Sequence, residues 1–212
     1  MSRSRTLSAV VLGTLALIFT AAMLIQAEPA RATVMVEVSL DDMARDADAI
    51  VRGTITRTGV RLEFEAGRLE PYSSSELRVS EWLAGGTGDR LVIRERGGEW
   101  QGGGHWIDGT PQYRVGEEVI VFLQRDADQP GRYRTYAMAQ GKFVVLRGVP
   151  GTGGQVRRDL EGMSFARWAG QGMQLEAGQA PVMALDTFLA RIRAVRTYFG
   201  GTRPADELGG VR

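Results

Sequence analysis

The sequence predicts a mainly β fold in which one short helix precedes the strands and one amphipathic helix follows them. Short runs rich in Val, Ile and aromatic residues recur through the middle of the 212-residue chain, and pairs or triplets of glycine separate them. Apolar residues at helical spacing stand near the two ends of residues 33–199. Several short strands without alternating helices are typical of a small β-barrel or a β-sandwich.

Residues 1–32 have the features of a bacterial secretory signal peptide. Two arginines lie within the first five residues, residues 7–25 form an apolar run of 19 residues without a charge, and the small-x-small pattern Ala30-Arg31-Ala32 follows. A signal peptidase accepts such a site. We therefore expect export to the periplasm or the medium and a mature chain that begins at Thr33. Cleavage after Ala27 is one alternative, and an uncleaved membrane anchor is another, since 19 apolar residues just span a bilayer.

The first element of the mature chain is predicted to be a short helix over residues 39–48. Ser39 is followed three residues later by Asp42, which is a capping signal, and apolar residues then recur at helical spacing. Strands are predicted where apolar and β-branched residues cluster between turn signals, at residues 50–56, 76–83, 90–94, 118–123, 132–136 and 142–146.

The C-terminal part is predicted to hold loops and one helix. Residues 150–181 are rich in glycine and weakly patterned, so we expect long loops there with one hairpin around residues 156–165. Apolar residues from Leu185 to Val195 recur at helical spacing and mark an amphipathic helix. This helix is expected to end at Gly200-Gly201 and to cover one side of the barrel. The sequence thus predicts a single domain over 33–199 and a flexible tail over 200–212.

Composition narrows the kinds of partner and cofactor that we expect. Residues 33–212 carry 23 Arg and Lys against 24 Asp and Glu, so no excess of positive charge is available to neutralise phosphates and nucleic acid is not an expected partner. The chain has no cysteine, which excludes thiol catalysis, Cys-ligated zinc and iron–sulfur clusters. We predict no cofactor and no metal site, and contact with a membrane only through the signal segment before cleavage.

No catalytic constellation is predicted from the titratable and nucleophilic residues. His105 is the only histidine. Ser164 stands in Gly-Met-Ser-Phe-Ala, which is close to the G-x-S-x-G elbow of α/β-hydrolases, but that triad needs a histidine after the serine. Glu117 and Glu118 are adjacent at the start of a strand, so their side chains point to opposite faces. A hydrolase that uses Ser164 or Glu117 with His105 is kept as an alternative.

One segment carries a resemblance to a known family. The run Ala-Asp-Ala-Ile-Val-Arg-Gly-Thr-Ile at residues 47–55 resembles the first strand of OB-fold domains of the tissue-inhibitor-of-metalloproteinases type. Together with residues 116–123 and 140–143, it also looks like a loose group of uncharacterised exported bacterial proteins, over residues 34–146. The resemblance implies a small OB-like β-barrel. These inhibitors place the N-terminal amine of a cysteine on a catalytic zinc, whereas here the corresponding residue is Thr33 and no disulfide holds it.

The strand at residues 50–56 also carries a packing prediction. Val51, Gly53 and Ile55 share one face at period two, and we expect that face to point inward. A glycine in the interior of a strand is favoured where another backbone approaches closely, so we expect such an approach at Gly53.

The function expected from the sequence is that of an exported, non-enzymatic domain that binds a protein or a cell-envelope component. The expected binding surface is the place where the glycine-rich loop 97–113 meets the N-terminal segment 33–38. Glycine lets the backbone adapt, and aromatic rings supply contact area at little entropic cost. The residues expected there are Thr33, Trp100, His105, Trp106 and Tyr113. An inhibitor of proteases that acts through Thr33 is a second alternative.

Overall fold

The computed structural model describes residues 33–199 except 66, 102, 106, 127–130, 149–152, 161–162, 170–171 and 180. The expected leader over 1–32, the expected tail over 200–212 and Trp106 therefore lie outside the described residues. The described residues belong to one compact unit that begins at Thr33. None of their helices is long and apolar enough to cross a membrane.

Strands dominate the described chain, and an α-helix lies near each end. The N-terminal half holds β1 (Thr33–Val36), α2 (Leu40–Asp46), β2 (Ala49–Glu65), β3 (Arg68–Ala84), β4 (Arg90–Arg96), β5 (Gly98–Trp100) and β6 (Gly103–His105). The C-terminal half holds β7 (Glu118–Arg125), β8 (Arg132–Thr135), the 3-10 helix η1 (Met138–Gly141), β9 (Lys142–Leu146), β10 (Gln155–Arg158), β11 (Met163–Ala169), β12 (Gly172–Ala177), β13 (Met183–Ala184) and α3 (Leu185–Phe199). The predicted mainly β fold with a helix near each end is confirmed.

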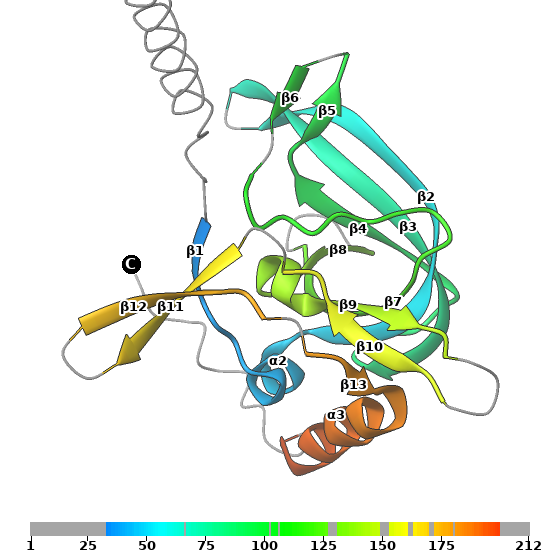
Figure 1. Cartoon of the computed structure of the whole chain (residues 1–212). Coiled ribbons are helices and arrows are strands. Elements are labelled where there is room, and N and C mark those ends of the chain that lie inside the picture. The colour runs from blue at the N-terminus through cyan, green and yellow to red at the C-terminus, as the bar shows by residue number, and fades with distance from the viewer. Residues whose placement is uncertain are drawn as a thin grey trace, which may run out of the picture. The chain divides into compact units, whose positions relative to one another are not determined.

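Within the described residues, five strands close into a ring in the order β2-β3-β4-β8-β7 (Figure 1). Neighbouring strands are antiparallel, except that β4 and β8 are parallel, and the pairing of β7 with β2 closes the ring. The strands β9, β10 and β13 extend the sheet from β7. A closed five-stranded ring of this kind is the OB-like form expected from the sequence.

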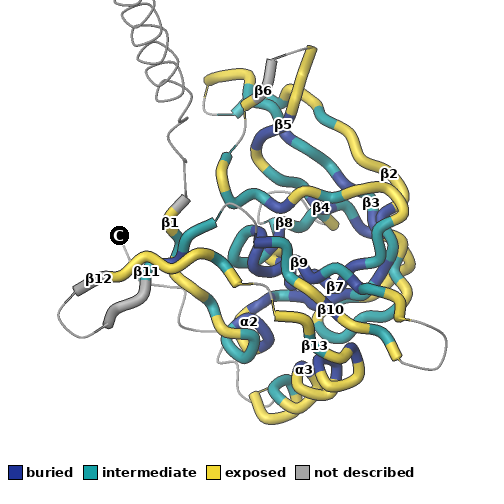
Figure 2. Tube along the Cα trace, in the orientation of Figure 1, coloured by how far each residue is buried: buried dark blue, intermediate teal, exposed yellow. Residues whose placement is uncertain are grey.

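Apolar residues form two layers, one inside the ring and one between the ring and the helices. The interior holds Ala49, Val51, Ile55, Leu77, Leu91, Ile93, Val119, Val121 and Leu123. The second layer joins the outer face of β2, β7, β9 and β10 to α2 and α3, and its larger members are Met43, Ile50, Ile120, Phe122, Phe143, Phe188 and Ile192. Figure 2 shows these buried segments in dark blue, whereas the far half of β2 is largely exposed.

The strand β7 lies between the two layers, which accounts for its unbroken apolar run. Val119 and Val121 point into the ring, and Ile120 and Phe122 point toward the helices. A strand buried on both faces has no polar side, so period-two alternation is absent from its sequence.

Both predicted helices are present and pack on this outer layer. Ser39 caps α2 by accepting a hydrogen bond from the N–H of Asp42 at 3.1 Å, as the capping signal indicates. Arg191 of α3 forms two hydrogen bonds with the carboxylate of Asp41 at 2.6 and 2.9 Å. The C-terminal helix therefore covers one side of the ring, as expected, and is also joined to α2.

Two predicted segments differ from the structure. The strands β2 and β3 are each 17 residues long, whereas the sequence predicted strands only over 50–56 and 76–83. The hairpin predicted around 156–165 is wrong, because β10 pairs with β9 and β13 in the main sheet and the hairpin is formed by β11 and β12. The physical reason is that β10 buries Val156 in the outer layer, which leaves β11 to pair with β1 and β12.

The inward packing predicted for Val51, Gly53 and Ile55 is confirmed. Val51 and Ile55 lie in the ring interior, and Gly53 is buried opposite Val79. A Cβ atom on Gly53 would overlap the carbonyl oxygen of Arg78 and the side chain of Leu77.

We expect Gly53→Ala to lower the free energy of unfolding by about 1–3 kcal/mol, because the added methyl group must push apart packed backbone. Gly59→Ala on the same strand is the matched control, since nothing lies within 4 Å of a Cβ there. Its expected effect stays within about 0.5 kcal/mol. Urea unfolding of both variants measures the difference, and equal effects would contradict the close approach at Gly53.

Candidate functional site

Trp100 and His105 lie on the hairpin formed by β5 and β6. Trp100 ends β5 and is 38% exposed, and His105 ends β6 with its Nδ1 3.4 Å from Oε2 of Glu70. The N–H of Gly97, just before β5, donates to the carbonyl of Pro71 on β3 at 2.8 Å. The hairpin is thereby tied to the far end of the long β2–β3 pair (Figure 1).

Tyr113 lies elsewhere, against the residues that fill the ring interior. Its hydroxyl is 2.7 Å from Oγ1 of Thr135, and burial raises the pKa of Tyr113 well above its ordinary value. Trp82 is also half-buried, and its Nε1 donates to the carbonyl of Gly88 at 2.7 Å. The aromatic side chains of Tyr113 and Trp82 therefore pack against the five-stranded sheet, and they do not form an exposed aromatic surface with Trp100.

Thr33 begins β1, where it lies opposite Met163 of β11. The segment that follows is held by Gln140, which is 1% exposed. Its Oε1 accepts from the N–H of Val38 at 2.8 Å and its Nε2 donates to the carbonyl of Val36 at 3.0 Å. A side-chain amide thus replaces a neighbouring strand for this stretch of backbone.

The loop 97–113 approaches the N-terminal segment at Gly109, which lies beside the Sδ atom of Met35. This point is away from Trp100 and His105, which lie on the β5–β6 hairpin. Among the described residues of the expected set, Trp100 and His105 share the β5–β6 hairpin, while Tyr113 and Thr33 lie elsewhere.

Ser164, Glu117 and His105 each have separate surroundings. Ser164 lies within β11, paired with Val34 and Ala177, and not on the turn that a nucleophile elbow requires. Glu117 forms an ion pair with Lys142 at 2.7 Å, while His105 faces Glu70. No hydrogen bond among the described residues joins any two of the three, so this geometry does not support the hydrolase alternative.

The only lysine of the sequence is a buried residue at one end of the ring. Lys142 is 3% exposed and Glu117 is 11% exposed, and the Nζ also donates to the carbonyl of Gln112. The Nζ lies 4.9 Å from the centre of the Tyr113 ring, on which it forms a cation–π contact. Burial lowers the pKa of Lys142, and the hydrogen bond and charge of Glu117 oppose that shift.

A second partly buried acid, Glu95, lies near Tyr113. The backbone N–H and the hydroxyl of Thr135 both donate to Oε1 of Glu95, at 2.7 and 2.6 Å. Burial raises the pKa of Glu95 to about 7, although the two hydrogen bonds from Thr135 act in the opposite direction. Every donor and acceptor named here is satisfied internally, so we assign this group to the stability of the ring.

A groove crosses the outer face of the ring strands. Two adjoining hollows of about 290 and 450 Å³ share Arg57 and Glu76. Strand register places Arg57 opposite Glu76, Glu76 opposite Val92 and Val92 opposite Arg132, so one row of side chains crosses β2, β3, β4 and β8. The next row contains Gly59 and Ser74, whose small size leaves the floor open. We call this surface the arginine groove.

Arginines predominate on the walls of the arginine groove. The residues that line it include two glutamates, Glu63 and Glu76, and five arginines, Arg57, Arg61, Arg78, Arg90 and Arg132. Arg57 pairs with Glu76, and the Nη1 of Arg132 is 3.8 Å from Glu63. Three other guanidinium groups are exposed and have no ion pair or hydrogen bond with another described residue, and these are Arg61, Arg78 and Arg90.

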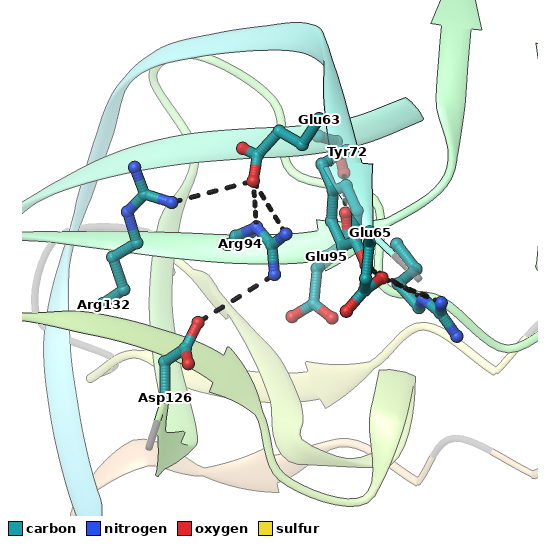
Figure 3. A network of polar contacts seen from close by, with 9 residues as sticks. Glu63, Glu65, Tyr72, Arg94, Glu95, Asp126 and Arg132 are labelled. Atoms are coloured by element: carbon teal, nitrogen blue, oxygen red, sulfur yellow. Dashed lines mark hydrogen bonds and ion pairs between the residues drawn. The ribbon is translucent and has the colours of Figure 1, made fainter. Parts of the chain in front are cut away.

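A network of charged side chains fixes the upper end of the arginine groove (Figure 3). The guanidinium of Arg94 donates to Glu63 at 2.7 and 3.0 Å, lies 3.9 Å from Asp126, and stacks 3.4 Å from the centre of the buried ring of Tyr72. Burial lowers the pKa of Arg94, but the hydrogen bond and charge of Glu63, together with Tyr72 and Asp126, more than offset it, so the pKa of Arg94 is raised. Because Glu63 is on the far half of β2 and Arg94 is on β4, this network joins that half of β2 to β4.

The arginine groove was missed from the sequence because many of its residues belong to the unpredicted extension of β2. A signal was present. From Val60 to Glu65, apolar and charged residues alternate strictly, which is the period of a strand. Continuing the predicted strand through Gly59 would have placed Arg57, Arg61 and Glu63 on one face.

The chain matches no family model and no curated protein sequence. In the part of the chain that the structure describes, no group of three or more His, Asp or Glu side chains stands close enough together to hold a metal ion. The candidate site therefore rests on its own geometry.

Proposed function

We propose that this protein is an exported, non-enzymatic binding domain that holds an anionic ligand in the arginine groove. The observation that carries the proposal is that Arg61, Arg78 and Arg90 line a groove and make no ion pair with other described residues. Exposed arginines commonly pair with neighbouring acids, as several others in this chain do, and unpaired donors on a hollow surface are available to a ligand.

The charge of the chain as a whole strengthens this interpretation. Residues 33–212 are close to neutral, so the arginine excess in the groove is a local feature and not a reflection of overall basicity. A local field of one sign attracts ligands of the opposite sign. The Arg94–Glu63 network supports the same proposal, since it keeps the upper wall in place before a ligand arrives.

The test expresses the full chain, purifies the protein and titrates it with dextran sulfate in a calorimeter. The only charged groups of this polymer are sulfates. We expect binding that weakens at high salt, because exposed charges are screened. Arg61→Ala and Arg90→Ala should weaken it, and Arg157→Ala, an exposed arginine on β10, should not. Equal losses in all three variants, or absence of binding to dextran sulfate and to a carboxylated polymer alike, would refute the proposed use of the groove.

Export makes a separate prediction. N-terminal sequencing of the protein recovered from cells that express the full chain should begin at Thr33, because Ala30-Arg31-Ala32 follows the apolar run. Recovery of chains with Met1 intact in the membrane fraction would favour the anchor alternative.

A further inference from the structure

We infer that the ligand of the arginine groove is an acidic polysaccharide, a polymer of sugars that carry carboxylate groups. This inference rests on the proposed function and names the class of ligand. It follows from three features of the groove, which are its mixture of charges, the absence of aromatic side chains among the described residues that line it, and the pairing of the strands beneath it.

The groove offers acceptors as well as donors. Its arginines suit carboxylates, because the guanidinium fork matches the two oxygens of a carboxylate. Glu63 and Glu76 line the same hollow, and each already pairs with an arginine. Their carboxylates keep lone pairs that can accept hydrogen bonds from hydroxyl groups of a ligand, and the hydroxyl of Ser74 on the floor can donate to or accept from the same groups. A polymer of acidic sugars carries both carboxylates and hydroxyls.

The described part of the lining lacks the aromatic rings on which single-stranded nucleic acid stacks. Proteins that bind such strands combine positive charge with exposed aromatic side chains. Among the described residues that line the arginine groove, none is aromatic. Tyr72 is only 2% exposed and lies beneath Arg94, so it is not available for stacking.

The backbone beneath the groove is already paired. The strand β3 is hydrogen-bonded to β2 on one side and to β4 on the other, so an extended peptide cannot add to it as a new strand. The ligand is therefore recognised by side chains.

The experiment compares four polymers on the protein expressed as the full chain, by calorimetry at low and high salt. They are polygalacturonate, its fully methyl-esterified form, dextran sulfate and single-stranded oligothymidylate of matched charge. We expect polygalacturonate to bind most tightly and the neutral methyl ester not to bind. Arg61→Ala and Arg90→Ala should each weaken polygalacturonate binding about tenfold, with Arg157→Ala unchanged and all three variants unfolding in urea like the wild type.

The outcomes separate this inference from the proposed function. Binding of dextran sulfate at the groove without binding of polygalacturonate would overturn the inference and leave an anion-binding groove. Oligothymidylate binding as tightly as polygalacturonate, with the same loss in Arg61→Ala, would also overturn it. Absence of binding to every polymer, or an equal loss in Arg157→Ala, would overturn both.

Discussion

Replacing Lys142 by methionine is expected to lower the free energy of unfolding by about 3–5 kcal/mol, the usual cost when one partner of a buried ion pair is removed. The variant leaves the carboxylate of Glu117 only 11% exposed and without its counter-charge. It also leaves the carbonyl of Gln112 without its donor and removes the cation from the face of Tyr113. Urea unfolding at pH 7 measures the loss.

A second variant separates the ion pair from simple packing. In Lys142→Met with Glu117→Gln, no buried charge is left unpaired, and most of the lost stability should return, because a neutral pair does not carry the desolvation cost of a lone carboxylate. Arg147→Ala is the control for a surface pair. Arg147 is 83% exposed and Glu118 keeps Arg52 as a partner, so the expected change is below about 1 kcal/mol. A double variant no more stable than Lys142→Met would show that the loss is not electrostatic.

The elements that were predicted well are those whose signal is local. Ser39 with Asp42 placed the start of α2 within one residue, because a cap is a contact between residues three apart. The strand β9 was predicted with its observed bounds, 142–146, since glycine precedes its compact apolar run and a loop follows it. The packing at Gly53 was predicted correctly because a glycine inside an apolar strand usually marks a close backbone approach or a bend.

Two kinds of element were missed, one whose pairing is local in sequence and one whose partner is distant. The far halves of β2 and β3 extend beyond the core, and their apolar side chains stay exposed, such as Phe64 at 74% and Leu69 at 62%. A prediction that looks for strands with one buried face therefore ends before them. The parallel pairing of β1 with β11 joins Thr33 to Met163. No local pattern distinguishes that pairing from any other arrangement of a short N-terminal strand.

The arginine groove illustrates the same limit at the level of the site. Its central row takes Arg57, Glu76, Val92 and Arg132 from four strands, and only the register brings them together. The sequence directed attention instead to the loop 97–113, because glycines and aromatic residues are conspicuous there. Tyr113 proved to be part of the packing, where its hydroxyl meets Thr135.

Glu95 is expected to make the stability of the protein fall between about pH 4.5 and pH 7. Burial raises the pKa of Glu95 to about 7 in the folded state, against an ordinary value of 4.5. Below pH 4.5 the carboxyl group is protonated in both states, and the stabilisation is complete. As the pH rises, the unfolded chain releases this proton first, so stability decreases until the folded protein also ionises, and the total loss is about 3 kcal/mol.

Glu95→Gln tests this directly, because an amide does not titrate and its Oε1 can still accept the two hydrogen bonds from Thr135. The groups around Glu95 are Thr135, Tyr113 and Arg134, and none of them has an ordinary pKa between 4.5 and 7. We therefore expect the variant to match the wild type near pH 4.5 and to exceed its free energy of unfolding by about 3 kcal/mol at pH 8. Glu99→Gln, on the exposed strand β5, should leave the pH dependence unchanged. If urea unfolding of Glu95→Gln and of the wild type gave parallel curves from pH 4.5 to pH 8, the pH dependence of stability would have to come from groups other than Glu95.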